Sequence, residues 1–106
     1  MSFEDARQHV RDFVEAREWS QFHSAENLSK SIAIEAAELL ELFQWGTTPA
    51  KQEVEGELAD VLTYCIILAD QLGLDPAEIV LKKLRTSEGK YPVEKARGRN
   101  TKYDKL

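Results

Sequence analysis

The sequence predicts an all-α fold: one domain over residues 1–106, built as a bundle of four main helices with a basic C-terminal arm. Apolar residues recur at helical spacing along most of the chain, and start and stop signals divide it into segments. No stretch alternates apolar and polar residues as a half-buried strand does, and no internal repeat is present. A chain of 106 residues is long enough for one compact domain with a modest core.

The first helix is expected over residues 2–18, with Ser2 as its N-cap and Asp5 at the capping-box position. Residues 19–23 then break the helical pattern and bring three ring side chains to the junction: Trp19, Phe22 and His23. These rings either close one end of a helix bundle or stack on a nucleobase beside a polar cleft. The residues alone favour closure of the bundle.

The second helix is expected from about Ser24, which can cap it, to Trp45, with Gly46 ending it. Pro49 suits the first turn of a third helix, which extends to about Leu72 and stops at the glycine that follows.

The third helix is apolar on nearly every face between residues 58 and 69, and such a helix must be covered all round. A chain of this length has little material for that, so we expect a homo-oligomer that buries the helix between subunits. Cys65, the one cysteine, lies in this run and is expected to be a buried thiol. The single cysteine, the lack of a signal peptide and the lack of a membrane-spanning run indicate a cytoplasmic protein.

The fourth helix has a clear start at Asp75, Pro76 and Glu78, which supply the N-cap, the N1 proline and an acid at N3. We expect Gly89 to end this helix. The chain beyond it is polar, is marked by glycine and proline, and is expected to be only partly helical.

The charges are divided unevenly along the chain. Residues 82–106 carry a net charge of +6, and residues 1–81 carry −11. An acidic body with a basic arm suits a metal-bridged phosphate ligand, because the acids hold the cation and the bases hold the phosphates. A solvated basic tail has the same composition, so charge alone does not decide between the two.

Two helices carry a pair of acids three residues apart. In the second helix, Glu35 falls inside the apolar arc and Glu38 at its edge; Glu57 and Asp60 repeat this arrangement in the third helix. A carboxylate in a core-facing stripe is costly unless it is paired or binds a metal. Facing helices would aim four hard oxygen donors at one point, which suits Mg²⁺, with Mn²⁺ as the alternative. Taken singly, Glu38 and Glu41 are also typical of an exposed helix face, and Glu57 and Asp60 are also typical of a salt-bridged interface.

Several other chemistries are excluded by the motifs. The sequence has no Gly-x-x-x-x-Gly-Lys phosphate loop, no His/Cys metal cluster and no Ser-His-Asp set. A di-iron bundle would need Glu-x-x-His pairs, and neither acidic helix contains a histidine. A Mg²⁺ ion held by carboxylates instead neutralises phosphate charge and positions or activates a water for attack on phosphorus.

Five stretches between residues 18 and 99 carry a resemblance to a known family: Glu18-Trp19-Ser20-Gln21-Phe22-His23, Asn27-Leu28, residues 38–45, residues 57–64 and Lys90-Tyr91-Pro92. In this order and spacing they resemble the MazG-like all-α nucleoside triphosphate pyrophosphohydrolases, and most closely the dCTP pyrophosphatase branch. The resemblance covers most of the chain and implies a MazG-like bundle completed by oligomerisation.

The resemblance implies hydrolysis of dCTP or a related (deoxy)nucleoside triphosphate to the monophosphate and pyrophosphate, with Mg²⁺, in house-cleaning of the nucleotide pool. It implies four metal ligands, one of which also orients or deprotonates the attacking water: Glu35, Glu38, Glu57 and Asp60. It implies a base and sugar pocket lined by Trp19, His23, Asn27, Trp45 and Tyr64. It implies phosphate contacts from Lys83, Lys90 and Tyr91. Family members are dimers or tetramers with sites shared between subunits, so a homo-oligomer, a tetramer rather than a dimer, is expected. No nucleic-acid polymer and no membrane is expected as a partner.

The chain departs from the family pattern at two places. Ile34 stands where many relatives have a glutamate, and Ser87-Glu88 stands where the branch has an Asn-Arg pair. The second change replaces a phosphate or sugar contact, so a broader nucleotide preference fits the same residues. The alternative hypothesis is a non-catalytic helical interaction or regulatory module, in which glutamine or leucine could replace the carboxylates with a gain in stability.

Overall fold

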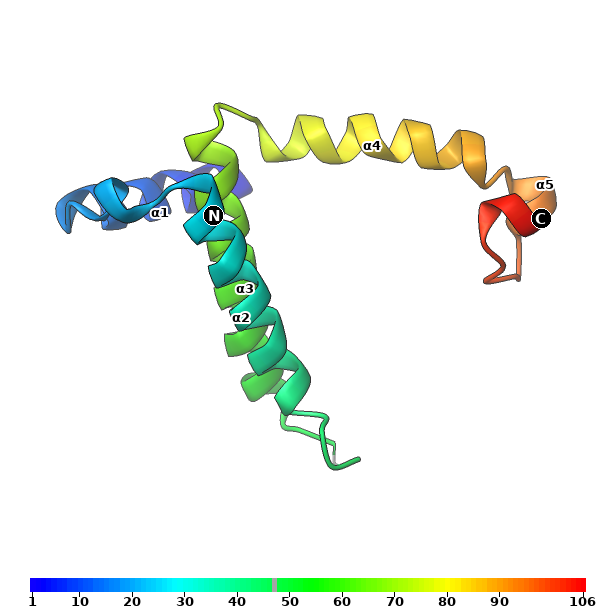
Figure 1. The fold of residues 1–106 in the computed structure, drawn as a ribbon, viewed down its shortest axis with the longest axis horizontal. Coiled ribbons are helices and arrows are strands. Elements are labelled where there is room, and N and C mark those ends of the chain that lie inside the picture. The colour runs from blue at the N-terminus through cyan, green and yellow to red at the C-terminus, as the bar shows by residue number, and fades with distance from the viewer. Residues whose placement is uncertain (47) are drawn as a thin grey trace. The chain divides into compact units, whose positions relative to one another are not determined.

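The structure is a computed structural model that describes residues 1–46 and 48–106, and these residues form helices, turns and loops. The predicted all-α fold is confirmed. Figure 1 shows the helices in chain order: α1 (Phe3–Ala16), the 3₁₀ helix η1 (Trp19–Phe22), α2 (Ala25–Glu41), α3 (Lys51–Gln71), α4 (Pro76–Lys90), α5 (Val93–Ala96) and the 3₁₀ helix η2 (Tyr103–Lys105). The chain divides into two compact units, Met1–Gly73 and Leu74–Leu106.

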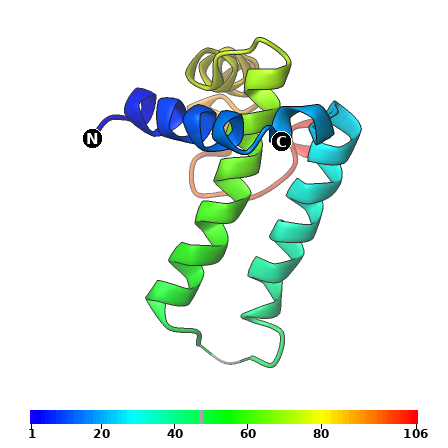
Figure 2. The same cartoon turned by 90° about the vertical axis from the view of Figure 1, so that its left-hand side faces the viewer.

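In the first unit, α2 and α3 form a helical hairpin. The two helices lie side by side along their length, and α1 crosses α3 at the end of the hairpin where α2 begins and α3 ends (Figures 1 and 2). The loop between α2 and α3 lies at the opposite end (Figure 2). An antiparallel hairpin places residues of α2 opposite residues of α3 that are far away in sequence, which is what the candidate site requires.

The core of this unit lies where the three helices meet. Val14 of α1, Leu28 of α2 and Ile67 of α3 form the buried cluster, and Leu28 is only 1% exposed. Three partly buried side chains pack against the cluster: Val10, Tyr64 and Leu68. The core therefore holds the α1 end of the hairpin together.

The helix starts agree with the capping predictions. Ser2 accepts a hydrogen bond from the Asp5 backbone N–H, and the Asp5 carboxylate accepts one from Ser2, so the predicted capping box is present. Ser24 caps α2 by accepting from the Asn27 N–H at 3.1 Å. Asp75 caps α4 by accepting from the backbone N–H groups of residues 77 and 78.

The loop between α2 and α3 begins earlier than the sequence predicts. Helix α2 ends at Glu41 rather than at Trp45, because residues 42–44 bond to carbonyls three residues back, as in a tightened last turn. Gly46 does adopt the left-handed conformation, with φ of 69°, but it lies four residues beyond Leu42, the C-cap of α2. Pro49 precedes the N-cap residue Ala50 and is not the first residue of α3, so that prediction was wrong. Thr47 lies outside the described residues.

In the second unit, α4 continues through Gly89 to Lys90. The prediction that Gly89 ends the helix was wrong, because Gly89 does not take the positive φ of a helix-ending glycine; Gly98 does, with φ of 72°. The expected partly helical arm contains the short helices α5 and η2.

The outer face of α3 is open. Leu58, Leu62 and Leu72 are 45%, 51% and 54% exposed, and Cys65 is exposed rather than buried as expected. Within its unit, α3 packs mainly against α2 and α1, which leaves these side chains partly uncovered. Among the described residues, no helix is both long and apolar enough to cross a lipid bilayer.

Candidate functional site

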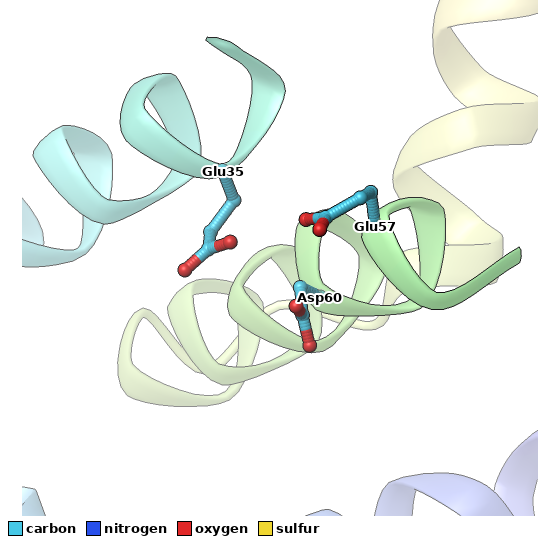
Figure 3. Close-up of side chains that lie close together, drawn as sticks. All are labelled: Glu35, Glu57 and Asp60. Carbon is cyan, nitrogen blue, oxygen red and sulfur yellow. The ribbon is translucent and has the colours of Figure 1, made fainter. Parts of the chain in front are cut away.

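Three of the predicted acids converge between α2 and α3. One carboxylate oxygen from each of Glu35, Glu57 and Asp60 lies within 4.8 Å of the corresponding oxygens of the other two. Figure 3 shows Glu35 reaching from α2 toward the two side chains on α3. Glu57 and Asp60 share a face because residues three apart lie on one side of a helix, and the hairpin brings Glu35 opposite them.

The burial of these side chains follows the helical wheel. Glu35 and Glu57, which the wheel places inside the apolar arcs, are half-buried, and Asp60, at the edge, is exposed. The Oε2 atoms of Glu35 and Glu57 are buried and make no hydrogen bond to any described residue. A buried carboxylate oxygen without a partner is costly, so these atoms are suited to a ligand from outside the described residues.

Burial and mutual repulsion change the acidity of the cluster. Burial raises the pKa of Glu35, and interaction with Glu38, Asp60 and Glu57 raises it further. Burial also raises the pKa of Glu57, with further contributions from Glu38 and Asp60. Because Glu38 acts on both groups, it belongs to the same electrostatic cluster, although its carboxylate is not among the three that converge within 4.8 Å.

The cluster fits a divalent cation. None of the ion pairs within residues 1–46 and 48–106 includes Glu35, Glu38, Glu57 or Asp60, so their negative charge is not compensated by a lysine or arginine. The donors are all carboxylate oxygens, which is the donor set of hard cations such as Mg²⁺ and Mn²⁺ and not of zinc structural sites. The two unpartnered Oε2 atoms lie in this cluster.

The aromatic junction precedes α2, at the end of the hairpin where the core lies. Asn27 donates a hydrogen bond from its side-chain amide to the Phe22 carbonyl at 3.1 Å, and this bond ties η1 to the first turn of α2. His23 is half-buried, and its Nδ1 atom is buried without a hydrogen-bond partner among the described residues. Trp19 remains 43% exposed. The three predicted residues Trp19, His23 and Asn27 therefore lie in η1, at its C-cap and in the first turn of α2.

The other two residues predicted for the base and sugar pocket lie elsewhere in the first unit. Tyr64 follows Asp60 by one helical turn and packs against the core cluster. Trp45 is 81% exposed and lies in the loop at the far end of the hairpin. The 17 residues of α2 span about 25 Å, so Trp45 is not brought together with Trp19 within one chain.

The three residues predicted to contact phosphates belong to the second unit. The Lys90 ammonium lies 4.6 Å from the centroid of the Tyr103 ring, and Tyr91 meets the same ring edge-on at 6.1 Å. Lys83 lies on α4 and lines a shallow groove with Ile79 and Leu84. Tyr103 was missed by the sequence reasoning; its only signal was an aromatic residue in a basic arm.

A second group of residues that sequence reasoning missed surrounds the aromatic junction. Arg17 lies over the Phe13 ring, and Phe13 meets Trp19 edge-to-face. Arg11 of α1 forms a forked ion pair with Asp70 of α3 through its Nε atom, 3.1 Å from each carboxylate oxygen. Helical spacing places Arg17 beside Phe13, which is four residues earlier on α1, but the Phe13–Trp19 and Arg11–Asp70 pairs join residues that only an irregular turn or the tertiary fold brings together.

Known proteins resemble the chain in sequence and in structure. The model of the MazG-like family matches residues 30–106. "dCTP pyrophosphatase 1" of Mus musculus is 36% identical over 115 residues, covering 99% of this chain and 68% of the relative, and the Homo sapiens protein of that name is 35% identical over the same shares. A solved pyrophosphatase from Archaeoglobus fulgidus superposes with a TM-score of 0.77 at 41% identity, covering 84% of this chain and 91% of that one.

The family that the sequence suggested and the all-α fold agree with these matches. The chain belongs to the MazG-like family.

Proposed function

We propose that this protein hydrolyses dCTP or a related deoxynucleoside triphosphate to the monophosphate and pyrophosphate, with Mg²⁺ as its cation and Mn²⁺ as the alternative. The reaction class, nucleoside triphosphate pyrophosphohydrolysis, is that of its relatives, which carry the names dCTP pyrophosphatase and pyrophosphatase. The observation that carries the proposal is the convergence of Glu35, Glu57 and Asp60, with two buried carboxylate oxygens that have no hydrogen-bond partner among the described residues.

In this proposal Glu35, Glu38, Glu57 and Asp60 hold the cation. The bound cation neutralises the phosphate charge and lowers the barrier to attack at phosphorus. A water oxygen attacks the α-phosphorus, the bond from that phosphorus to the bridging oxygen breaks, and pyrophosphate leaves with the bridging oxygen. One of the four carboxylates orients the water and accepts its proton, as general bases do.

The nucleoside end of the substrate is assigned to the aromatic junction. Asn27 precedes Glu35 by eight residues on α2, which corresponds to about 12 Å along the helix axis. An extended triphosphate that reaches from the acid cluster toward the start of α2 would bring its base to the rings of Trp19 and His23. Tyr64, one turn beyond Asp60, would lie between the two ends.

We also propose that the working protein is a homo-oligomer, a tetramer rather than a dimer. Trp45 lies at the far end of the hairpin from Trp19, so a pocket lined by both requires Trp45 of a second copy. The open face of α3, with Leu58 and Leu62 about half exposed, supplies an apolar surface for that contact.

The phosphates are assigned to the basic second unit. Lys83, Lys90 and Tyr91 would contact the phosphates, because positive charge is concentrated in this part of the chain and not near the acid cluster. Such a protein would serve in the cytoplasm, in house-cleaning of the nucleotide pool, which agrees with its single cysteine.

The test is release of pyrophosphate from a panel of dNTPs and NTPs, with Mg²⁺ and with EDTA. We expect monophosphate and pyrophosphate as products, loss of activity in EDTA and in Asp60→Asn, and a ranking of nucleotides led by dCTP or a close relative. Glu55→Gln is the matched control: Glu55 is an exposed acid on α3, about 200° around the helix from Glu57. Turnover that survives in Asp60→Asn would refute the role of Asp60 in holding the cation. No turnover of any nucleotide by the wild type would favour the non-catalytic alternative.

A further inference from the structure

Arg17 caps the C-terminal end of α1 and also contacts an aromatic ring. It is the C-cap residue of α1, and its Nη1 atom donates a hydrogen bond to the Phe13 carbonyl at 3.0 Å. Its guanidinium carbon lies 3.7 Å from the centroid of the Phe13 ring. A cation at a helix C-terminus also interacts favourably with the helix dipole, so this guanidinium is held by several interactions at once.

The Phe13 ring, which Arg17 contacts, is also in contact with Trp19. Phe13 and Trp19 meet edge-to-face, with ring centroids 5.6 Å apart and an interplanar angle of 78°. The same guanidinium carbon lies 6.0 Å from the Trp19 ring. Edge-to-face contact is a preferred geometry for aromatic pairs, and it fixes the tilt of one ring relative to the other.

The backbone between Arg17 and Trp19 is strained. Glu18 has φ of 53° and ψ of 36°, and it is the only residue other than glycine with positive φ in the part of the chain that the structure describes. The left-handed conformation costs an L-residue roughly 1–2 kcal/mol. Gln21 donates from its side-chain amide to the Glu18 carbonyl at 2.9 Å, which helps to hold this turn. The turn is what returns Trp19 to the face of α1 that carries Phe13.

The indole is both fixed and accessible. Trp19 and Phe13 are 43% and 48% exposed, so the contacts that fix them leave ring surface open to a ligand. Immobilising a side chain on binding costs about 0.5–1.5 kcal/mol, and a ring that is already fixed avoids this cost. Strained backbone of the kind seen at Glu18 is typical of ligand clamps.

We propose that Arg17, together with Phe13, is a positioning residue that holds the Trp19 indole ready to receive the nucleobase. Arg17 does not itself touch the substrate. The inference rests on the proposed function for the assignment of the base to Trp19, and it adds the residues that set the orientation of that ring.

The kinetic test compares Arg17→Met, Arg17→Lys and Phe13→Leu with the wild type. An exposed cation–π contact supports a two- to fivefold effect. We expect Arg17→Met to raise KM for the preferred nucleotide by about that factor with kcat within about twofold, and Arg17→Lys to restore part of the loss. In a Trp19→Ala background, Arg17→Met should change KM no further. Lys30→Met removes an exposed cation that pairs with Glu26 on the surface of α2 and is the matched control.

A second measurement reads the position of the ring without any nucleotide. In a Trp45→Phe background, Trp19 is the only tryptophan. We expect Arg17→Met and Phe13→Leu to lower the fluorescence anisotropy of Trp19 and to increase its quenching by acrylamide, with the far-UV circular dichroism unchanged.

The two measurements separate the inference from the proposed function. Unchanged anisotropy in both variants, or an unchanged KM in Arg17→Met while Trp19→Ala raises KM, would overturn the positioning role. A wild-type protein without nucleotide turnover would refute the proposed function, and a Trp19→Ala variant with normal KM would refute the stacking role that the inference needs.

Discussion

The cation site predicts that Mg²⁺ stabilises the protein and that removal of one carboxylate weakens this stabilisation. A ligand that binds only the folded protein at 100 times its dissociation constant adds about 2.7 kcal/mol. For a chain of 106 residues, 1 kcal/mol corresponds to about 4 °C in Tm. We therefore expect Mg²⁺ at that concentration to raise the Tm of the wild type by about 10 °C above its value in EDTA.

Addition of Mg²⁺ should reverse the order of the melting temperatures of the wild type and the Glu57→Gln variant. In EDTA the variant should melt above the wild type, because the substitution removes a half-buried charge whose pKa is raised by burial and by Glu38 and Asp60. In Mg²⁺ it should melt below the wild type. Loss of a group that supports a metal ligand lowers metal affinity at least tenfold, and loss of a direct ligand should lower it at least as much. The rise in Tm caused by Mg²⁺ should therefore fall to about 5 °C or less in the variant.

The assay is thermal unfolding followed by circular dichroism at a fixed protein concentration, with Mg²⁺ titrated to about 100 times its dissociation constant for the wild type. Glu55→Gln makes the same charge change on the same helix and should follow the wild type in both buffers. Equal Mg²⁺ shifts in the wild type and Glu57→Gln, or no shift in the wild type, would refute the assignment of the cluster as a cation site.

Three further predictions concern stability. Leu28→Ala should cost about 2–5 kcal/mol by urea unfolding, because Leu28 is 1% exposed at the centre of the core; a loss below about 1 kcal/mol would contradict that core. An added Cβ meets nothing within 4 Å at Gly73 or Gly56, so backbone conformation alone decides the effect of alanine at each position. Gly73→Ala should destabilise the protein by about 1–2 kcal/mol, because Gly73 has φ of 67°. Gly56→Ala should stabilise it by about 0.5–1 kcal/mol, because Gly56 lies within α3. In EDTA, the stability of the wild type relative to a Glu35→Gln, Glu57→Gln double variant should depend on pH. The folded pKa values of both groups are raised above 4.5, so the contribution of the neutral acids is fully present below pH 4.5 and is lost as the pH rises through the raised values; a flat Tm difference between pH 7 and pH 4.5 would contradict this.

Local signals were the reliable part of the sequence reasoning. The capping residues Ser2, Ser24 and Asp75 each cap the helix that the sequence assigns to them, because a cap depends on hydrogen bonds within three residues. Helix ends were less predictable. Gly89 fits inside α4 because a glycine is permitted, and not obliged, to take positive φ, so its presence alone does not end a helix.

The acid cluster was predictable for a similar reason. Helical periodicity alone places Glu35 and Glu57 in the apolar arcs of their helices and Asp60 at the edge, and their exposure in the structure follows that order. The periodicity could not show that the two arcs face each other, nor that the oxygens of three acids approach within 4.8 Å while the Glu38 carboxylate stays outside that set.

Local sequence patterns predicted the all-α class, the helix caps, the two acidic pairs and the family, because each depends on residue types at short spacings along the chain. The tertiary fold established which residues from different segments meet. It joined Arg11 to Asp70 across 59 residues of chain, gathered Val14, Leu28 and Ile67 into one core, and turned Trp19 back onto Phe13 through the left-handed Glu18. Contacts of this kind depend on how whole helices pack and on single strained turns, and the spacing of residues along the chain carries no information about either.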